Sequence, residues 1–195
     1  MLNIIKERLK HHELLEGLKA GDDLLPQAAV LVPITRNNLE PEVLLTLRSK
    51  ALSSHAGEVS FPGGKKDDID VSLEHTALRE SFEEVGIPRH KVDVVGRLSS
   101  RKSKYGLNVT PYVGIFPKEL ELKTNPEELS CAFTVPLRFF AETTPSTVKT
   151  VELKGVKYKV PSYNYGEFNI WGLTALVLVE LVNLVFDAKI SLIEE

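Results

Sequence analysis

Cysteine, methionine and tryptophan each occur only once in this chain of 195 residues, and aromatic residues make up just 7% of it. Because Cys131 has no second cysteine to pair with, an intrachain disulfide is excluded, and we expect a reducing intracellular environment. We interpret Cys131 as a small, partly buried apolar residue. The first residues of the sequence lack an uninterrupted apolar core, so we expect no secretory signal peptide.

A long hydrophobic run is missing as well. The most apolar stretch, residues 170–186, is shorter than the ~20 residues that span a bilayer. Glu180, Asn183 and Asp187 follow at i, i+3 and i+7, which places a polar stripe on an otherwise apolar helix. We therefore expect a helix packed on a sheet, and no membrane partner.

The chain has no excess of basic residues either. It contains 24 Lys and Arg residues and 27 Asp and Glu residues, which gives a net charge of -3. A general nucleic-acid-binding domain would be basic, so we expect no nucleic-acid partner, although a nucleotide is still allowed as a small substrate. The length suits one domain with a full core. Nothing in the composition indicates an oligomeric state.

The order of helix and strand signals predicts an α/β fold. Helices are expected at about residues 2–18, 73–85 and 171–186, and strands at 28–33, 42–48, 58–61, 92–98 and 109–116, with a hairpin at 148–161. Gly86 suits the left-handed position that ends the second helix, and Pro88 follows it. We predict a mixed β-sheet sandwiched between helices, an α/β/α arrangement. We divide the chain into an N-terminal helix and linker (1–24), one domain (25–187) and a C-terminal tail (188–195).

The most informative segment is an acidic helix that follows a glycine turn. At about 100° per residue, the residues expected on its buried side are Ala77, Leu78, Ser81, Phe82 and Val85. The opposite side is expected to carry three carboxylates, with Arg79 beside them: Glu80, Glu83 and Glu84. Three carboxylates within two turns repel one another, and a divalent cation with oxygen ligands supplies the missing counter-charge.

A solvated acidic surface is the ordinary explanation for such a cluster taken alone. Here, however, Phe61-Pro62-Gly63-Gly64 precedes the helix, and a glycine turn lets backbone groups approach an ion or a phosphate closely. Glu80 and Glu84, at i and i+4, are best placed to share one ion. The combination favours a metal site over a solvated surface.

The segment Arg79–Ile87, RESFEEVGI, resembles the REUxEExGU half of the Nudix box, with Ser81 at the aliphatic position. The resemblance implies that Glu80, Glu83 and Glu84 bind Mg²⁺ or Mn²⁺ and position the attacking water, with Glu83 as a catalytic residue. It also implies that Arg79 holds a glutamate in place through a bidentate pair.

The first half of the box, GxxxxxE, departs from the family pattern. Counted back from Arg79, its glutamate falls at Val71 and its glycine at Lys65, so the segment after Gly64 is stretched by one residue. Four acidic residues are candidates for the missing glutamate, and the sequence does not choose among them: Asp67, Asp68, Asp70 and Glu74.

The same stretching occurs in the coenzyme A diphosphatases, which carry a second motif, LLTxRSxxxRxxxGxxxFPGG. Residues 44–64 match this motif, except that Ser53 replaces its second arginine. The resemblance is tight over residues 44–87 and extends loosely to residues 171–175, WGLTA. It implies that five residues bind substrate: Arg48, Ser49, Gly57, Phe61 and Gly64.

The resemblance therefore implies a metal-dependent Nudix diphosphatase that cleaves the pyrophosphate bond of coenzyme A or acyl-CoA. The products would be 3′,5′-ADP and (acyl-)4′-phosphopantetheine. Basic residues near the box are candidates for phosphate contacts, although we expect most of them to be solvated: Lys50, Lys65, Lys66, Arg97, Arg101, Lys102 and Lys104.

Two alternatives stay open. One is a Nudix hydrolase of another dinucleotide, such as NADH or ADP-ribose. The other is a non-catalytic Nudix-fold binding module, which the intact REUxEE disfavours. Related enzymes are often peroxisomal, but this sequence ends in ISLIEE without an SKL-type tripeptide, so a cytoplasmic location is open too.

Overall fold

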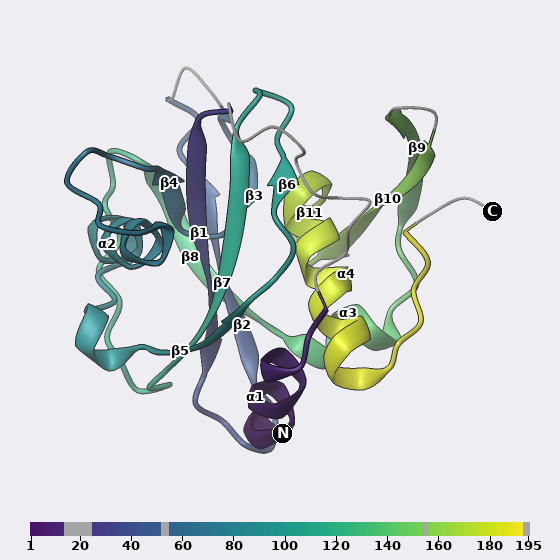
Figure 1. Ribbon diagram of the computed structural model, residues 1–195, viewed down its shortest axis with the longest axis horizontal. Coiled ribbons are helices and arrows are strands. Elements are labelled where there is room, and N and C mark those ends of the chain that lie inside the picture. The colour runs from purple at the N-terminus through teal and green to yellow at the C-terminus, as the bar shows by residue number, and fades with distance from the viewer. Residues whose placement is uncertain (14–24, 52–54, 154–155, 193–195) are drawn as a thin grey trace.

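A computed structural model of the chain describes residues 1–13, 25–51, 55–153 and 156–192. The described residues form one mixed eight-stranded sheet, a smaller three-stranded sheet and helices on both sides of the larger sheet (Figure 1). The predicted α/β/α arrangement is therefore confirmed.

The larger sheet has the strand order β3-β2-β1-β7-β5, with three further strands attached to this path. Its strands are β1 (Gln27–Thr35), β2 (Glu42–Arg48), β3 (Val59–Ser60), β4 (Gly63–Lys65), β5 (Asp93–Arg97), β6 (Arg101–Lys102), β7 (Asn108–Phe116) and β8 (Leu129–Pro136). β1 and β7 pair in parallel, whereas β4 pairs with β1, and β8 with β2, in antiparallel fashion. The small sheet holds β9 (Thr147–Leu153), β10 (Val156–Tyr165) and β11 (Phe168–Ile170).

The helices cover the two faces of the larger sheet. They are α1 (Leu2–Lys10), α2 (Leu73–Val85), α3 (Leu137–Glu142) and α4 (Gly172–Phe186), with a short 3₁₀ turn, η2 (Arg89–Lys91). In Figure 1, α2 lies on one side of the sheet, and α1 and α4 lie on the other. A strand points successive side chains to opposite faces. Accordingly, Leu31 and Leu44 pack on the α2 side, while Val32 and Val43 belong to the main core under α4.

Most predicted elements are present, and α2 has the predicted bounds. Its limits follow local signals: the Ser72 side chain accepts a hydrogen bond from the His75 backbone N–H, and Gly86 is left-handed, with a φ of 73°. The first helix is shorter than predicted and ends at Lys10, since residues 11–13 are not helical and residues 14–24 lie outside the described chain. The turn of the predicted hairpin, residues 154–155, also lies outside it.

The sequence analysis missed β4, β6, β8, β11 and α3. β8 contains a run of small and polar residues around Cys131 that carries no clear alternation, and it becomes a strand by pairing along the whole of β2. Cys131 is partly buried there, as expected, and burial raises the pKa of its thiol. Tertiary pairing, rather than local propensity, determines this strand.

α4 is the apolar helix that the sequence indicated. Its polar stripe is buried at one end, because Glu180 is only 4% exposed and accepts a hydrogen bond from the backbone N–H of Ser99, whereas Asp187, just after the helix, is exposed. The Asn183 side chain donates a hydrogen bond to the backbone oxygen of Ile190 and accepts one from the Ile190 N–H. Among the described residues, no helix is both long and apolar enough to cross a membrane.

Candidate active site

The glycine turn and the acidic face of α2 meet closely. A Cβ atom built on Gly64 would lie 2.5 Å from the carboxylate of Glu80, and one on Gly63 would lie 2.4 Å from the backbone oxygen of Ala29. Gly63 therefore requires glycine, because a side chain there would collide with the backbone of β1, whereas a side chain at Gly64 would push the Glu80 carboxylate aside. The glycine turn thus lies directly against the acidic face of α2.

Glu84 is the most deeply placed of the three box glutamates. It is 2% exposed, its Oε2 accepts a hydrogen bond of 3.3 Å from the Gly63 N–H, and its Oε1 lies 3.6 Å from Nη1 of Arg48. Burial raises the pKa of the Glu84 carboxyl to about 8, although the positive charge of Arg48 opposes the shift. The helix angles placed Glu84 opposite the buried face of α2, and that expectation is wrong, because the glycine turn of the sheet covers this side chain.

The carboxyl group of Glu80 also has a raised pKa, although Glu80 is less deeply buried than Glu84. Its side chain is 18% exposed, and burial raises the pKa of its carboxyl despite the adjacent Arg79. The negative charge of Glu80 also repels that of Glu84 and raises the pKa of Glu84 further. The two carboxylates are thus held together at the turn with too little positive charge around them.

Glu128 is a third acid at this place, and the sequence analysis missed it. Its negative charge raises the pKa of Glu80 and of Glu84, and its backbone oxygen accepts a 2.8 Å hydrogen bond from the N–H of Ser49. No motif contains Glu128. It reaches the site because β8 begins at Leu129 beside the end of β2, a pairing that no local signal predicts.

Arg79 forms a second group of ion pairs, and its main partner is the carboxylate of Asp70. Its Nε and Nη2 donate to the two carboxylate oxygens of Asp70 at 3.0 and 2.9 Å, a bidentate pair. Asp70 is 3% exposed and also accepts hydrogen bonds from the Thr76 hydroxyl and the Asp67 N–H. The Arg79 guanidinium holds the pKa of the Asp70 carboxyl well below its usual range.

Among the four candidates for the missing box glutamate, Asp70 is thus the residue that pairs with Arg79. Counting back from Arg79 does not find it, but counting six residues forward from Gly64 does. Arg79 reaches the glutamates as well, with its Nη1 at 2.9 Å from Glu80 and 3.1 Å from Glu83. Arg79 therefore links the buried Asp70 to the acidic face of α2.

Glu83 does not point into the turn with the other two glutamates. Its side chain is 53% exposed and its carboxylate contacts Arg79. Among the described residues, no three acidic, histidine or cysteine side chains are close enough to form a complete metal site. Mg²⁺, however, typically binds through one or two carboxylates and completes its shell with waters and substrate phosphates. Glu80 and Glu84, short of counter-charge, fit that requirement by their chemistry.

The predicted substrate-binding residues lie in different surroundings. Arg48, at the end of β2, reaches Glu84, and the Gly57 N–H donates a 3.2 Å hydrogen bond to the backbone oxygen of Arg48. Gly57 is left-handed, with a φ of 71°, which suits glycine. Phe61, in contrast, is 3% exposed and belongs to the main core, so it supports the turn from behind.

Two of the basic candidates are already paired. Arg101 is buried against Glu180, to which it donates a short hydrogen bond, so it is not available to a phosphate. Lys104 forms a 2.7 Å ion pair with Glu58. His55, two residues before Gly57, has its Nδ1 at 2.7 Å from the Glu58 carboxylate as well.

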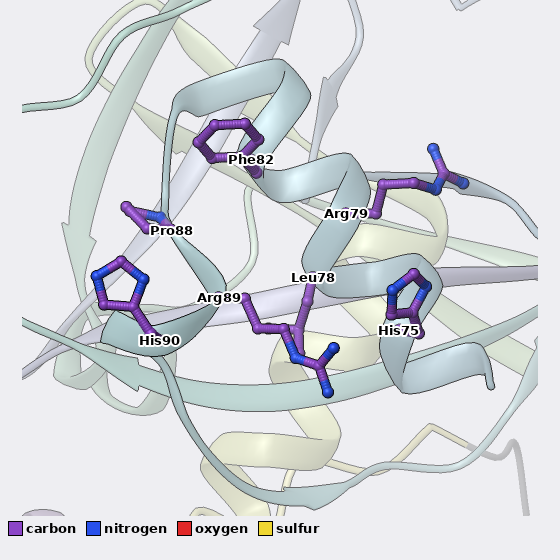
Figure 2. Close-up of a pocket in the computed structure, with 7 residues that line it drawn as sticks. All are labelled: His75, Leu78, Arg79, Phe82, Pro88, Arg89 and His90. Atoms are coloured by element: carbon purple, nitrogen blue, oxygen red, sulfur yellow. The ribbon is translucent and has the colours of Figure 1, made fainter. Parts of the chain in front are cut away.

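A shallow pocket of about 430 Å³ lies on the outer side of α2. Its lining residues are His75, Leu78, Arg79, Phe82, Pro88, Arg89 and His90 (Figure 2). Phe82 is 57% exposed here, so the prediction that Phe82 is buried is wrong: the apolar stripe of α2 is narrower than expected, and its buried face extends to Glu84 instead. At 100° per residue, Leu78 and Phe82 point away from Glu80 and Glu84. The pocket is therefore separate from the acidic site.

Comparisons with known proteins show the family of this chain. The family model of the NUDIX domain matches residues 25–150. A protein described as "Uncharacterized Nudix hydrolase NudL" from Photorhabdus laumondii is 45% identical over 154 residues, which cover 79% of this chain and 82% of the relative. The protein of the same description from Escherichia coli O1:K1 is 41% identical over 155 residues, 80% of each chain.

The solved structures add a likeness of fold. The crystal structure of a MutT/nudix family protein from Enterococcus faecalis superposes with a TM-score of 0.55 at 17% sequence identity. The match covers 96% of this chain and 70% of that one. At this level of identity, the likeness concerns the fold alone.

Proposed function

This chain belongs to the Nudix hydrolase family, and from that premise we propose that it cleaves the pyrophosphate bond of coenzyme A or an acyl-CoA. The products are then 3′,5′-ADP and 4′-phosphopantetheine or its acyl derivative. The family membership supports hydrolysis, and the motif of residues 44–64 supports this choice of substrate.

The observation that carries the proposal is the place of Arg48. Its guanidinium lies 3.6 Å from the Glu84 carboxylate, and its buried Nε has no hydrogen-bond partner among the described residues. A buried N–H donor without a partner costs free energy, which a ligand oxygen recovers by accepting it. Guanidinium groups suit phosphate oxygens. An arginine next to an acidic pair is therefore suited to a pyrophosphate that approaches the acids.

Nudix hydrolases use divalent metal ions, and Mg²⁺ or Mn²⁺ are the candidates for this chain. Glu80 and Glu84 are the residues that would hold the ion, with Glu83 as the third ligand that the motif implies. A divalent cation bound there lowers the pKa of water and offsets charge on the phosphoryl oxygens.

The protein groups around the acids have separate tasks in this proposal. Arg79, fixed by Asp70, positions Glu80 and Glu83. Glu83 is exposed enough to orient the attacking water and to accept its proton. Arg48 binds the phosphate oxygens and holds the bond to be cleaved over the glycine turn.

The test is a panel of coenzyme A, acetyl-CoA, NADH and ADP-ribose, incubated with Mg²⁺ or Mn²⁺ in H₂¹⁸O. We expect coenzyme A and acetyl-CoA to give products with the masses of 3′,5′-ADP and the phosphopantetheines, with label on one phosphate. Label in a released acetate would indicate thioester hydrolysis and contradict the proposal.

The same panel tests the alternatives. Preferred cleavage of NADH or ADP-ribose would replace coenzyme A as the substrate, and Ser53 in place of the motif's arginine is the feature that favours this outcome. No turnover of any compound with either metal would favour a binding module.

The relatives compared here also bear on the cellular location. They come from bacteria, which have no peroxisomes. We therefore do not propose the peroxisomal location that the resemblance implied.

A further inference from the structure

Two exposed aromatic rings share one lysine at the edge of the candidate site. The Nζ atom of Lys104 lies 5.0 Å from the ring centroid of Tyr105 and 5.2 Å from that of Trp171. Tyr105 belongs to the turn between β6 and β7, and Trp171 precedes α4, so segments far apart in the sequence meet here (Figure 1). Tyr105 is 52% exposed and Trp171 39%.

Such exposure is unusual in this chain. Among the described aromatic residues, the most exposed side chains are Phe82, Tyr105 and Trp171, and two of these three belong to this cluster. Their ring centroids lie no more than about 10 Å apart, because each is about 5 Å from the same nitrogen atom. Aromatic rings pair at centroid distances of roughly 4.5–7 Å. A flat ring in place of the ammonium group would therefore contact both side chains.

The Lys104 ammonium group, which lies between the two rings, is held there only weakly. The ammonium group of Lys104 forms its ion pair with Glu58 at the surface, where the lysine side chain is 50% exposed. Cation–π contacts and ion pairs at exposed sites contribute little to stability. Lys104 can therefore leave the two rings when a ligand with a larger aromatic surface arrives.

The cluster also lies next to the acidic site. On the antiparallel strands β2 and β3, Thr46 pairs with Ser60 and Leu47 with Val59, so Arg48 stands opposite Glu58. The N–H of Arg48 donates a 3.0 Å hydrogen bond to the backbone oxygen of Glu58. Arg48 therefore contacts Glu84 through its guanidinium group and Glu58 through its backbone, which places Glu58 and its partner Lys104 beside the residue next to the acidic pair.

We propose that Tyr105 and Trp171 form the subsite that holds the adenine ring of the substrate, which enters the space now filled by the Lys104 ammonium group. The proposal rests on the proposed function for the identity of the nucleotide. Stacking on aromatic rings gives affinity for any base. The Glu58 carboxylate, 2.7 Å from Lys104, becomes free to accept a hydrogen bond from the amino group of adenine.

Trp171 is the only tryptophan of the chain, so intrinsic fluorescence reports directly on this subsite. The experiment titrates the protein with 5′-AMP and, separately, with ribose 5-phosphate, which lacks the base. We expect a saturable change of Trp171 emission with AMP and none with ribose 5-phosphate. In Tyr105→Ala, the Kd for AMP rises roughly ten- to a hundredfold, because one stacking partner is lost.

The matched control is Phe82→Ala, which removes an equally exposed aromatic ring on the outer side of α2. It should leave the Kd for AMP unchanged. In steady-state assays with coenzyme A, Tyr105→Ala and Trp171→Phe should raise KM while kcat stays within about twofold, since the rings do not touch the reacting phosphates.

The outcomes separate this subsite from the proposed function. An emission change that ribose 5-phosphate also produces, no change with AMP, or an unaltered Kd in Tyr105→Ala overturns the subsite, even if coenzyme A is hydrolysed. If AMP binds as expected but coenzyme A is not cleaved, the substrate proposal fails, and the rings still form an adenine subsite.

Discussion

Asp70 and Glu84 lie at opposite ends of the same motif, and they are equally buried, at 3% and 2% exposure, yet their carboxyl groups are in opposite electrostatic states. Hydrogen bonds from Arg79 lower the pKa of Asp70, with further bonds from the Asp67 N–H, His75 and Thr76. Burial raises the pKa of Glu84 to about 8, since one long hydrogen bond and a guanidinium at 3.6 Å do not compensate it.

The difference shows that burial alone does not distinguish a structural carboxylate from a functional one. A buried acid with all its hydrogen-bond partners inside the protein stabilises the fold through them. A buried acid without them is costly, and it persists where a ligand completes its surroundings. Asp70 is of the first kind, and we propose that Glu84 is of the second, so substitution of Asp70 should lower stability and substitution of Glu84 should lower activity.

Asp70→Asn tests the structural side of this comparison. It removes the charge that the bidentate pair with Arg79 needs and leaves a partly buried guanidinium without its partner. We expect the free energy of unfolding to fall by ~3–5 kcal/mol, measured by urea denaturation. Asp68→Asn, an exposed change two residues away, is the control and should stay within about 0.5 kcal/mol of wild type.

The pH dependence of this variant sharpens the test. A carboxyl whose pKa is lowered by folding adds stability above its ordinary pKa, and this stability is lost as the pH falls below that value. Wild type should therefore lose stability between about pH 4 and pH 2 more steeply than Asp70→Asn. Parallel acid-unfolding curves would mean that Asp70 carries no such charge interaction.

Glu84→Gln and Glu80→Gln test the functional side. Each removes a charge but no packing, so we expect kcat to fall at least ~10²-fold at saturating Mg²⁺ while the folded structure is retained. Glu74→Gln, on the first turn of α2 and away from the glycine turn, should keep its turnover. Near-wild-type kcat in either site variant would remove that glutamate from the proposed metal ligands.

Arg48→Ala tests whether the cation beside Glu84 serves the substrate. Charge-assisted hydrogen bonds contribute ~1.5–3 kcal/mol, so kcat/KM for coenzyme A should fall roughly ten- to a hundredfold. Arg48→Lys keeps the charge but not the planar guanidinium, and it should recover only part of the loss. Equal kcat/KM in wild type and Arg48→Ala would mean that Arg48 only neutralises Glu84.

Parts of this molecule were predictable from sequence because their causes are local. Ser72, Gly86 and Pro88 limit α2 through capping and backbone geometry, and α2 has the predicted bounds. The spacing of Arg79, Glu80 and Glu84 is also a local feature, and it indicated the candidate site without any knowledge of the neighbouring strands.

Other parts depend on contacts between distant segments. Helix periodicity placed Glu84 opposite the buried face of α2, but Glu84 is buried because the turn at Gly63 covers it. Asp70 was one of four equal candidates until Arg79 was seen to pair with it. Glu128 and β8 reach the site through strand pairing alone. Phe82 has the helical angle expected for the core, yet it is 57% exposed.

The most direct test of the contrast between Asp70 and Glu84 is the free energy of unfolding of wild type and Glu84→Gln against pH, with EDTA or with Mg²⁺. A carboxyl whose pKa is raised by folding adds stability below its ordinary pKa, and this is lost as the pH rises through the raised value. Without metal, wild type should lose stability relative to Glu84→Gln between pH 4.5 and about 8. Mg²⁺ should restore it in wild type and not in the variant. A constant difference between the two proteins across this range, with the same response to Mg²⁺, would contradict a charge-deficient metal site at Glu84.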